Sequence, residues 1–169
     1  MSTADPAWPS VAELTAQERE LRWQRFDEDD AWRLGVALVE QARAPQLPLA
    51  IDISRGDHQL FHAALPGSSP DNDAWLARKT RVVRRFHLSS LHVGQLCRDA
   101  GRTLEDMFLV PERDFAAHGG AFPITVVGVG VVGCVAVSGL PQLQDHALVV
   151  EVLRGQLRAR TPSTPDQNP

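Results

Sequence analysis

The residues with the clearest chemical potential lie around one histidine. His118 directly precedes Gly119 and Gly120. Adjacent glycines allow positive φ, so their N–H groups can converge on an anion or the chain can bend sharply. An imidazole at such a bend can act as a base or as an axial metal ligand. A turn histidine bonded to a backbone carbonyl is the structural alternative, and the sequence leaves both open.

The single lysine of the chain is a second candidate. Lys79 is accompanied by sixteen arginines, and it lies four residues after Trp75 and four before Val83. That spacing puts it on the apolar stripe of a helix predicted from residue 72 to residue 86. Its stem would cross apolar surface while its ammonium reaches a carboxylate, a carbonyl or a ligand. We predict either an ion pair with an acid such as Asp145 or a ligand-facing role.

Basic residues crowd this helix. Arg84 or Arg85, together with Lys79, could receive the carboxylates of a small anion, because guanidinium forks match carboxylate geometry. The basic side chains are spread around the helix, and the sequence offers no aromatic or glycine-rich platform beside them, so we expect no nucleic-acid partner. The net charge of −4 gives no global attraction to nucleic acid or to an anionic membrane.

The elements that must position these residues follow from apolar runs, glycines and prolines. Residues 122–127 and 131–138 predict a β-hairpin whose second strand is apolar on both faces and therefore interior. A helix is predicted from about Gln142, with Asp145 in its first turn, where the helix dipole favours a carboxylate. Its predicted apolar stripe consists of Leu143, His146, Val150, Leu153 and Leu157.

Three earlier helices are also predicted. Thr15 and Glu18 have capping-box spacing and indicate the start of the first, and the second begins after Asp27. The third is capped at Ser89-Ser90 and ends at Gly101. The second helix is expected to present one face that consists of Trp32, Gly35, Val36 and Val39.

A second hairpin precedes the lysine helix. Residues 49–54 alternate as a half-buried strand, Arg55-Gly56-Asp57 turns the chain, and residues 58–65 return. The motif GVGVVG at residues 128–133 superficially matches the dinucleotide fingerprint. We reject that interpretation, because these glycines fall at a hairpin and inside a strand, with no helix beginning there to meet a pyrophosphate.

The spacing of the histidines and cysteines gives little support to metal or thiol chemistry. No HxxxH pair on a helix and no Cys/His ladder is present, so we expect no structural metal site. His146 fills a core position and is interpreted as a satisfied buried histidine. Cys97 and Cys134 lack metal or redox spacing, and we expect both to be reduced and buried.

Several motifs together resemble a known family. They are Lys79 with Phe86 and Ser89-Ser90, His118-Gly119-Gly120 with Phe122-Pro123-Ile124, Gly130 with Val132-Gly133, Val137-Ser138-Gly139-Leu140-Pro141, and Asp145-His146. Over most of the chain they are similar to the small bacterial and fungal haem-degrading-domain proteins related to the GlcG and HbpS fold. The resemblance implies an α/β (α+β) fold, profilin-like or PAS-like, with an antiparallel sheet backed by helices. It also implies a homo-oligomer, and related members bind haem or lie beside cobalamin and glycolate pathways.

Length and composition favour one domain. We expect it to span residues 11–160 between flexible ends at 1–10 and 161–169. The polar start lacks the features of a secretory signal and no apolar run approaches the roughly 20 residues of a membrane helix, so the expected location is the cytoplasm.

Two functions remain open from the sequence. In the first, the protein binds haem or a small anion in a pocket, with His118 as ligand or base and Lys79 as anion partner. In the second, the same residues lock a non-catalytic oligomeric scaffold or protein-interaction module, with Lys79 and Asp145 as a buried ion pair. The candidate ligand-binding residues are Lys79, Arg84, His118, Gly119, Gly120 and Asp145.

Overall fold

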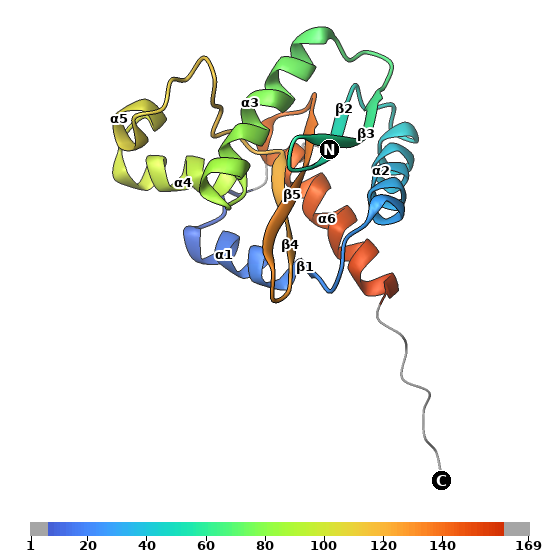
Figure 1. Ribbon diagram of the computed structural model, residues 1–169. Coiled ribbons are helices and arrows are strands. Elements are labelled where there is room, and N and C mark those ends of the chain that lie inside the picture. The colour runs from blue at the N-terminus through green and yellow to red at the C-terminus, as the bar shows by residue number, and fades with distance from the viewer. Residues whose placement is uncertain (1–6, 161–169) are drawn as a thin grey trace.

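The computed structural model describes residues 7–160, which form a mixed α/β domain (Figure 1). This confirms the predicted sheet backed by helices. In chain order the elements are α1 (Val11–Glu20), β1 (Arg22–Trp23), α2 (Glu28–Arg43), β2 (Ala50–Arg55), β3 (His58–Ala64), α3 (Pro70–Phe86), α4 (Ser90–Ala100), α5 (Leu104–Phe108), β4 (Ala121–Val126), β5 (Gly130–Ser138) and α6 (Gln142–Arg160).

The five strands form one sheet in the order β1-β4-β5-β2-β3. Strands β2 to β5 pair antiparallel as expected, whereas the two-residue β1 runs parallel to β4 and makes the sheet mixed. Strand β5 lies at the centre, which confirms its predicted interior position. Gly133 is needed there, because a Cβ at this position would lie 2.2 Å from the Ser54 carbonyl oxygen of β2.

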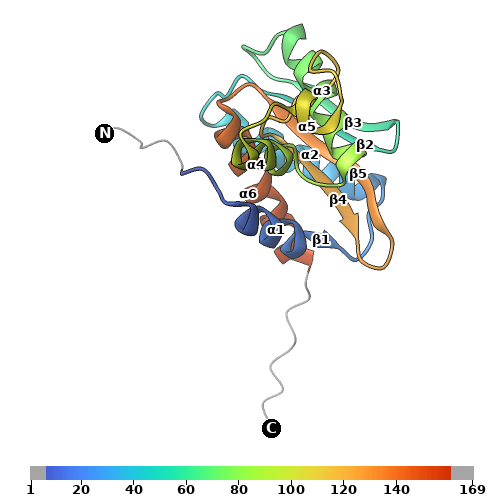
Figure 2. The same cartoon turned by 90° about the vertical axis from the view of Figure 1, so that its left-hand side faces the viewer.

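Helices cover both faces of the sheet (Figures 1 and 2). Helices α2 and α6 pack on the face that carries the large side chains, including Ile51, Phe122 and Val135. Helix α3 packs on the opposite face, where the sheet presents small side chains such as Ala50, Cys134 and Ala136. Because these side chains are short, α3 can lie close to the sheet. A smaller apolar cluster joins α3 to α4 and α5.

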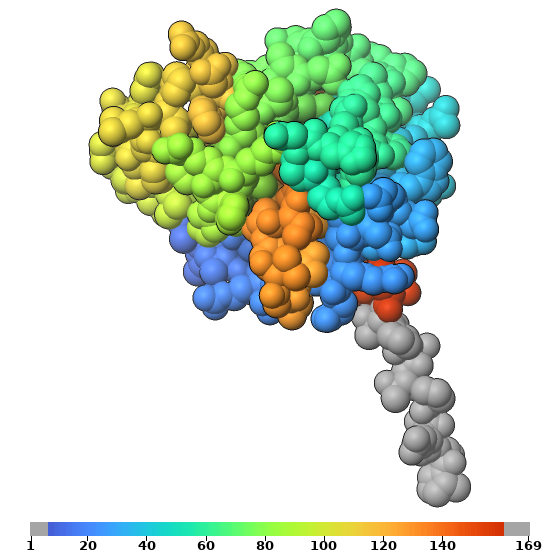
Figure 3. All heavy atoms as spheres, viewed as in Figure 1, coloured from blue at the N-terminus to red at the C-terminus, as the bar shows by residue number. Residues whose placement is uncertain are grey.

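Both predicted hairpins are present. The β4–β5 turn contains Gly128 and Gly130 at φ of +77° and +110°, and the β2–β3 turn contains Gly56 at +56°. Figure 3 shows the orange tip of the β4–β5 hairpin protruding on one side of the molecule, and there Val127 and Val129 are exposed. Helix α3 starts at Pro70 and α6 at Gln142, close to the predicted positions.

Helix α1 differs from the sequence expectation. It begins at Val11 and not near Thr15, because Ser10 and Glu13 form the capping box. The Thr15 hydroxyl donates instead to the Val11 carbonyl oxygen within the helix. The capping box therefore has the predicted spacing of three residues, but it is formed by Ser10 and Glu13 and not by Thr15 and Glu18. The carboxylate of Glu18 binds Ser89 and His92 of the α4 N-terminus.

The buried faces of α2 and β2 also differ from expectation. Of the predicted face, Gly35 is buried against Phe61 of β3, whereas Trp32 is 63% exposed and Val36 and Val39 are only partly buried. The fully buried apolar side chains of α2 are those of Ala31, Leu34, Leu38 and Ala42. Trp32 contacts Phe61 of β3 edge to face. Strand β2 is buried on both faces and is not half-buried, because α3 covers the side that carries Ala50 and Ser54.

The predicted flexible ends fall largely on residues 1–6 and 161–169, which lie outside the described residues. Ser10, which was assigned to the flexible N-terminus, is the described N-cap of α1. Within residues 7–160, none of the helices combines the length and apolar character required to cross a membrane.

Candidate functional site

A cavity of about 340 Å³ lies where the first half of α3 meets the start of α6 and the segment before β4. It brings together Lys79, His118 and Asp145, which are far apart in the sequence but were predicted to share a site. The other lining residues are Asp71, Asn72, Trp75, Ser138, Gly139, Leu140 and Gln142. Sequence reasoning assigned none of these to the site, although Trp75 precedes Lys79 by one helical turn on the same stripe.

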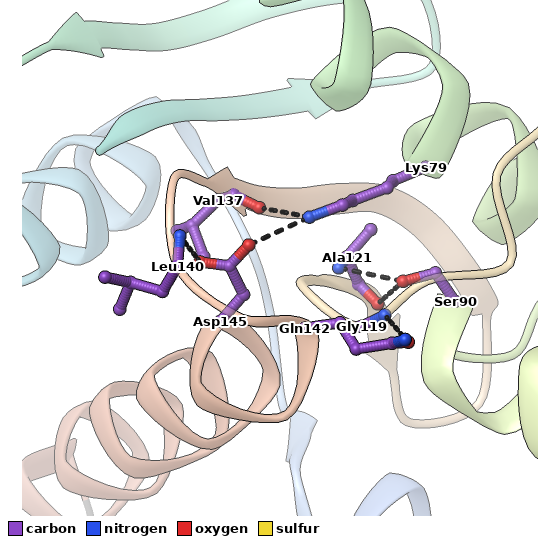
Figure 4. A network of polar contacts seen from close by, with 8 residues as sticks. All are labelled: Lys79, Ser90, Gly119, Ala121, Val137, Leu140, Gln142 and Asp145. Atoms are coloured by element: carbon purple, nitrogen blue, oxygen red, sulfur yellow. Dashed lines mark hydrogen bonds and ion pairs between the residues drawn. The ribbon is translucent and has the colours of Figure 1, made fainter. Parts of the chain in front are cut away.

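Lys79 and Asp145 form a buried ion pair (Figure 4). The Lys79 Nζ lies 3.0 Å from Asp145 Oδ2 and donates to the Val137 carbonyl oxygen at 3.1 Å. The second carboxylate oxygen of Asp145 accepts the Leu140 backbone N–H. Lys79 and Asp145 are 3% and 1% exposed. Of the two alternatives for Lys79, the structure contains the ion pair.

Burial works against both charges of this pair. It lowers the pKa of Lys79 and raises the pKa of Asp145, and in each case the charge of the partner opposes the shift. The pair joins the middle of α3 to the first turn of α6 and to β5. Its attraction and its backbone hydrogen bonds therefore offset the cost of removing two charges from water.

The two glycines are required by close packing. A Cβ on Gly119 would lie 2.1 Å from the Gln142 carbonyl oxygen, and one on Gly120 would lie 2.5 Å from that of Val137. Gly120 has φ of +125°, which confirms the predicted bend. The Gly119 N–H donates to the Gln142 side chain, as Figure 4 shows. This N–H is therefore already engaged, and the two glycines do not present a pair of free donors to an anion.

His118 lies at the rim of the cavity with its side chain partly in solvent. Its ring meets Trp75 at a centroid separation of 5.2 Å, nearly edge to face. Within residues 7–160 its imidazole makes no hydrogen bond, so the carbonyl-bonded turn histidine is not what the structure contains. The cavity wall removes part of its hydration and, with the charges of Lys79 and Arg78, lowers the pKa of His118. This shift favours the neutral imidazole, in which one ring nitrogen keeps a lone pair for a ligand.

Arg84 lies outside this cavity. Its guanidinium donates to Asp57, Ser54 and the Gly56 carbonyl oxygen, and it lines a separate cavity of about 480 Å³ between α3 and the β2–β3 hairpin. A separation of five residues from Lys79 rotates Arg84 by about 140° around the helix. Arg78 is the arginine that contacts a residue of the cavity lining, since its guanidinium carbon lies 4.6 Å from the Trp75 ring centroid.

The charges of the cavity do not favour a small free anion. Lys79 is already neutralised by Asp145, and Asp71 adds a second carboxylate to the lining.

The remaining histidines and cysteines serve other parts of the fold. His146 is buried, and its Nε2–H donates to the side-chain oxygen of Gln17 at 2.8 Å. Its Nδ1 has no partner within residues 7–160, so the predicted satisfied histidine is only half satisfied. His92 of α4 is buried, and its Nδ1 lies 3.0 Å from both carboxylate oxygens of Glu18. Cys97 and Cys134 are free and buried, as expected. Within residues 7–160, no three His, Cys, Asp or Glu side chains are grouped to hold a metal ion.

Sequence comparisons place the chain among close relatives. A UPF0303 protein of Streptomyces coelicolor is 60% identical over 153 residues, which cover 90% of this chain and 96% of the relative. A UPF0303 protein of Acidobacterium capsulatum is 48% identical over 143 residues, which cover 85% and 87% of the two chains.

Solved structures agree on the fold. The Ybr137w protein superposes with a TM-score of 0.82 at 33% identity, covering 88% of each chain. A PduOC:Heme complex has a TM-score of 0.64 at 17% identity and covers 78% of this chain and 94% of its own. HbpS has a TM-score of 0.60 at 18% identity, covering 82% and 92%, so these last two show the fold alone. Residues 26–154 match the model of one family, and the chain therefore belongs to the family described as haem degrading protein HbpS-like.

Proposed function

We propose that this protein binds haem at the mouth of the cavity, with His118 as an axial ligand of the iron. The observation that carries the proposal is a partly exposed imidazole at a cavity rim, free of competing hydrogen bonds within residues 7–160. Haem iron accepts a neutral imidazole nitrogen, and bound haem would supply a redox-active, Lewis-acidic centre.

The residues around His118 fit this group in kind. Trp75 offers an aromatic surface beside the imidazole, and the adjacent Arg78 offers a guanidinium that can pair with a propionate. The cavity of about 340 Å³ lies at the small end of the roughly 300–1,000 Å³ typical of ligand pockets. It would therefore admit an edge of a porphyrin and leave most of the ring outside.

The comparisons support haem over the small free anion. The matching family is described by haem degradation, and one structural neighbour was solved as a haem complex. The carboxylates of Asp71 and Asp145 in the same cavity disfavour an isolated anion, as their charges exceed that of Lys79. The proposal assigns binding and leaves the reaction, if any, unassigned.

A haemin titration of the purified protein, followed by the Soret absorbance, tests this proposal. We expect a saturable, near-stoichiometric red shift that His118→Ala loses. His58→Ala is the matched control, because His58 is an exposed histidine on β3, away from the cavity. The proposal is overturned if the parent protein shows no saturable shift, or if His118→Ala and His58→Ala both retain it.

A non-catalytic oligomeric scaffold is the second candidate. It is favoured by the ion pair itself, since Lys79 Nζ already has two partners and Asp145 both of its oxygens engaged. On this proposal the cavity residues stabilise the domain, and the exposed Trp32 is available to a second copy. Light scattering at micromolar concentration tests the homo-oligomer, which a monomeric mass would refute. We also retain the proposed cytoplasmic location, with which two free cysteines are consistent.

A further inference from the structure

A third cavity, of about 500 Å³, carries a charge opposite to that of the whole chain. It lies where β1 and the residues after it meet the C-terminal half of α6, two segments that run side by side in Figures 1 and 2. Its charged lining consists of one glutamate, Glu20, and five arginines, Arg22, Arg25, Arg154, Arg158 and Arg160. We call it the arginine cavity. The chain as a whole has a net charge of −4.

The arginines are only partly neutralised by the protein. Glu20 binds Arg154 through two hydrogen bonds, and the buried Asp30 pairs with Arg160. Within residues 7–160, no hydrogen bond or ion pair engages the guanidinium of Arg25 or Arg158, although the charge of Arg158 helps to lower the pKa of Glu20. Cations in the last turn of α6 are favoured by the helix dipole. That effect does not account for Arg25, which comes from the segment after β1.

The wall of the cavity contains a buried donor without an acceptor. Trp23 is 2% exposed and lines the cavity, and its indole Nε1 has no hydrogen-bond partner. An indole N–H can only donate, and buried donors in proteins are nearly always paired. The guanidinium of Arg160 lies over the same ring at 5.5 Å from its centroid. An oxygen atom of an anionic ligand bound beside this ring would satisfy the donor.

We propose that the arginine cavity binds a small molecule that carries two or more phosphate or carboxylate groups. Guanidinium forks match both groups, and several convergent arginines favour a multiply charged ligand over a single charge. The volume suits a small molecule. The site is separate from the proposed haem site, because Asp145 and Arg160 lie fifteen helical steps apart on α6, a separation of about 22 Å.

Isothermal titration calorimetry with pyrophosphate and with citrate tests the site and distinguishes its two ligand chemistries. At about 0.15 M ionic strength, where long-range attraction is screened, the parent should bind at least one of them saturably. The double variant Arg25→Ala/Arg158→Ala should weaken that binding about a hundredfold, or about tenfold for each charge-assisted contact. Both arginines are exposed, so the fold should survive, as far-ultraviolet circular dichroism would verify.

Three further variants separate this site from other causes. Trp23→Phe keeps the ring and removes the donor, so it should weaken binding about tenfold. Arg113→Ala removes an exposed arginine elsewhere on the surface and should bind as the parent does. His118→Ala should also bind the anion normally, so failure of the haem proposal would leave this one standing. The proposal is overturned if neither anion binds the parent, or if the Arg25→Ala/Arg158→Ala variant binds as tightly as the parent.

Discussion

Replacing Lys79 by methionine tests how the buried ion pair supports the domain. The substitution introduces an apolar side chain of similar length and removes the one cation that is bonded to Asp145 within residues 7–160. The carboxyl would remain 1% exposed, with the backbone N–H groups of Leu140 and Gly139 as its remaining hydrogen-bond donors among the contacts described. An uncompensated buried charge of this kind costs about 3–5 kcal/mol.

That cost is a large part of a typical stability of about 5–15 kcal/mol. With a urea m-value of about 2 kcal/mol/M, it would lower the unfolding midpoint by about 1.5–2.5 M. Unfolding should be followed at one fixed protein concentration, because a homo-oligomer would be stabilised by mass action. Lys79→Met/Asp145→Leu removes both charges and should recover most of the loss.

The penalty should also depend on pH in a defined direction. Without Lys79, burial holds the pKa of Asp145 above its ordinary value, so the folded variant binds a proton that the unfolded chain releases near pH 4. The stability of Lys79→Met relative to the parent should therefore fall as pH rises from about 4 toward neutrality. A midpoint within about 0.5 M of the parent at pH 7, or a double variant no more stable than Lys79→Met, would refute the structural role of the pair.

Three further predictions follow from packing and titration. Gly119→Ala should lower the free energy of unfolding, measured in urea, by at least about 2 kcal/mol, because the new Cβ would meet a backbone carbonyl. Gly155 of α6 faces open space, so Gly155→Ala should be neutral or stabilising by up to about 1 kcal/mol. Equal effects of the two substitutions would contradict this account. Burial lowers the pKa of His146 to about 4, so the unfolded chain takes up a proton before the folded protein does as pH falls below 6.5. The free energy of unfolding should therefore drop by about 3 kcal/mol between neutral pH and pH 4. His146→Asn should flatten this pH dependence of stability, and an unchanged slope in the variant would refute the prediction. Burial raises the pKa of the Cys134 thiol to about 12 and also raises that of Cys97, so neither should react with a thiol reagent at pH 8 until urea unfolds the protein; rapid labelling of the native protein would be inconsistent with this packing.

Periodicity and turn residues were sufficient to predict most of the elements. The apolar run of β5, the glycines of its hairpin and Pro141 before α6 have local physical causes, and the structure contains each feature. The errors arose where tertiary packing determines which side chains are buried. Trp32 has the hydrophobicity of a core residue, yet α2 packs on the sheet through smaller and aliphatic neighbours. Strand β1 has two residues, too few to show any period.

The candidate site was predictable in part. The single lysine, the histidine before the double glycine, and Asp145 were identified from the sequence, and all three line the cavity, whereas Gly119 and Gly120 do not. The rotation of Arg84 away from Lys79 could have been read from their five-residue separation. Two contacts depend on how α3 and α6 cross, which no local pattern specifies. They are the hydrogen bond from the Gly119 N–H to Gln142 and the ring contact between Trp75 and His118.

The central claim is that His118 supplies the iron ligand, and chemical rescue by imidazole tests it most directly. The absorption spectrum of the ferric haem complex should be recorded for the parent and for His118→Ala, before and after free imidazole is added to the variant. The account predicts that the variant lacks the parent's histidine-ligated spectrum and that imidazole restores it. A variant spectrum identical to that of the parent before imidazole is added would contradict the assignment of His118.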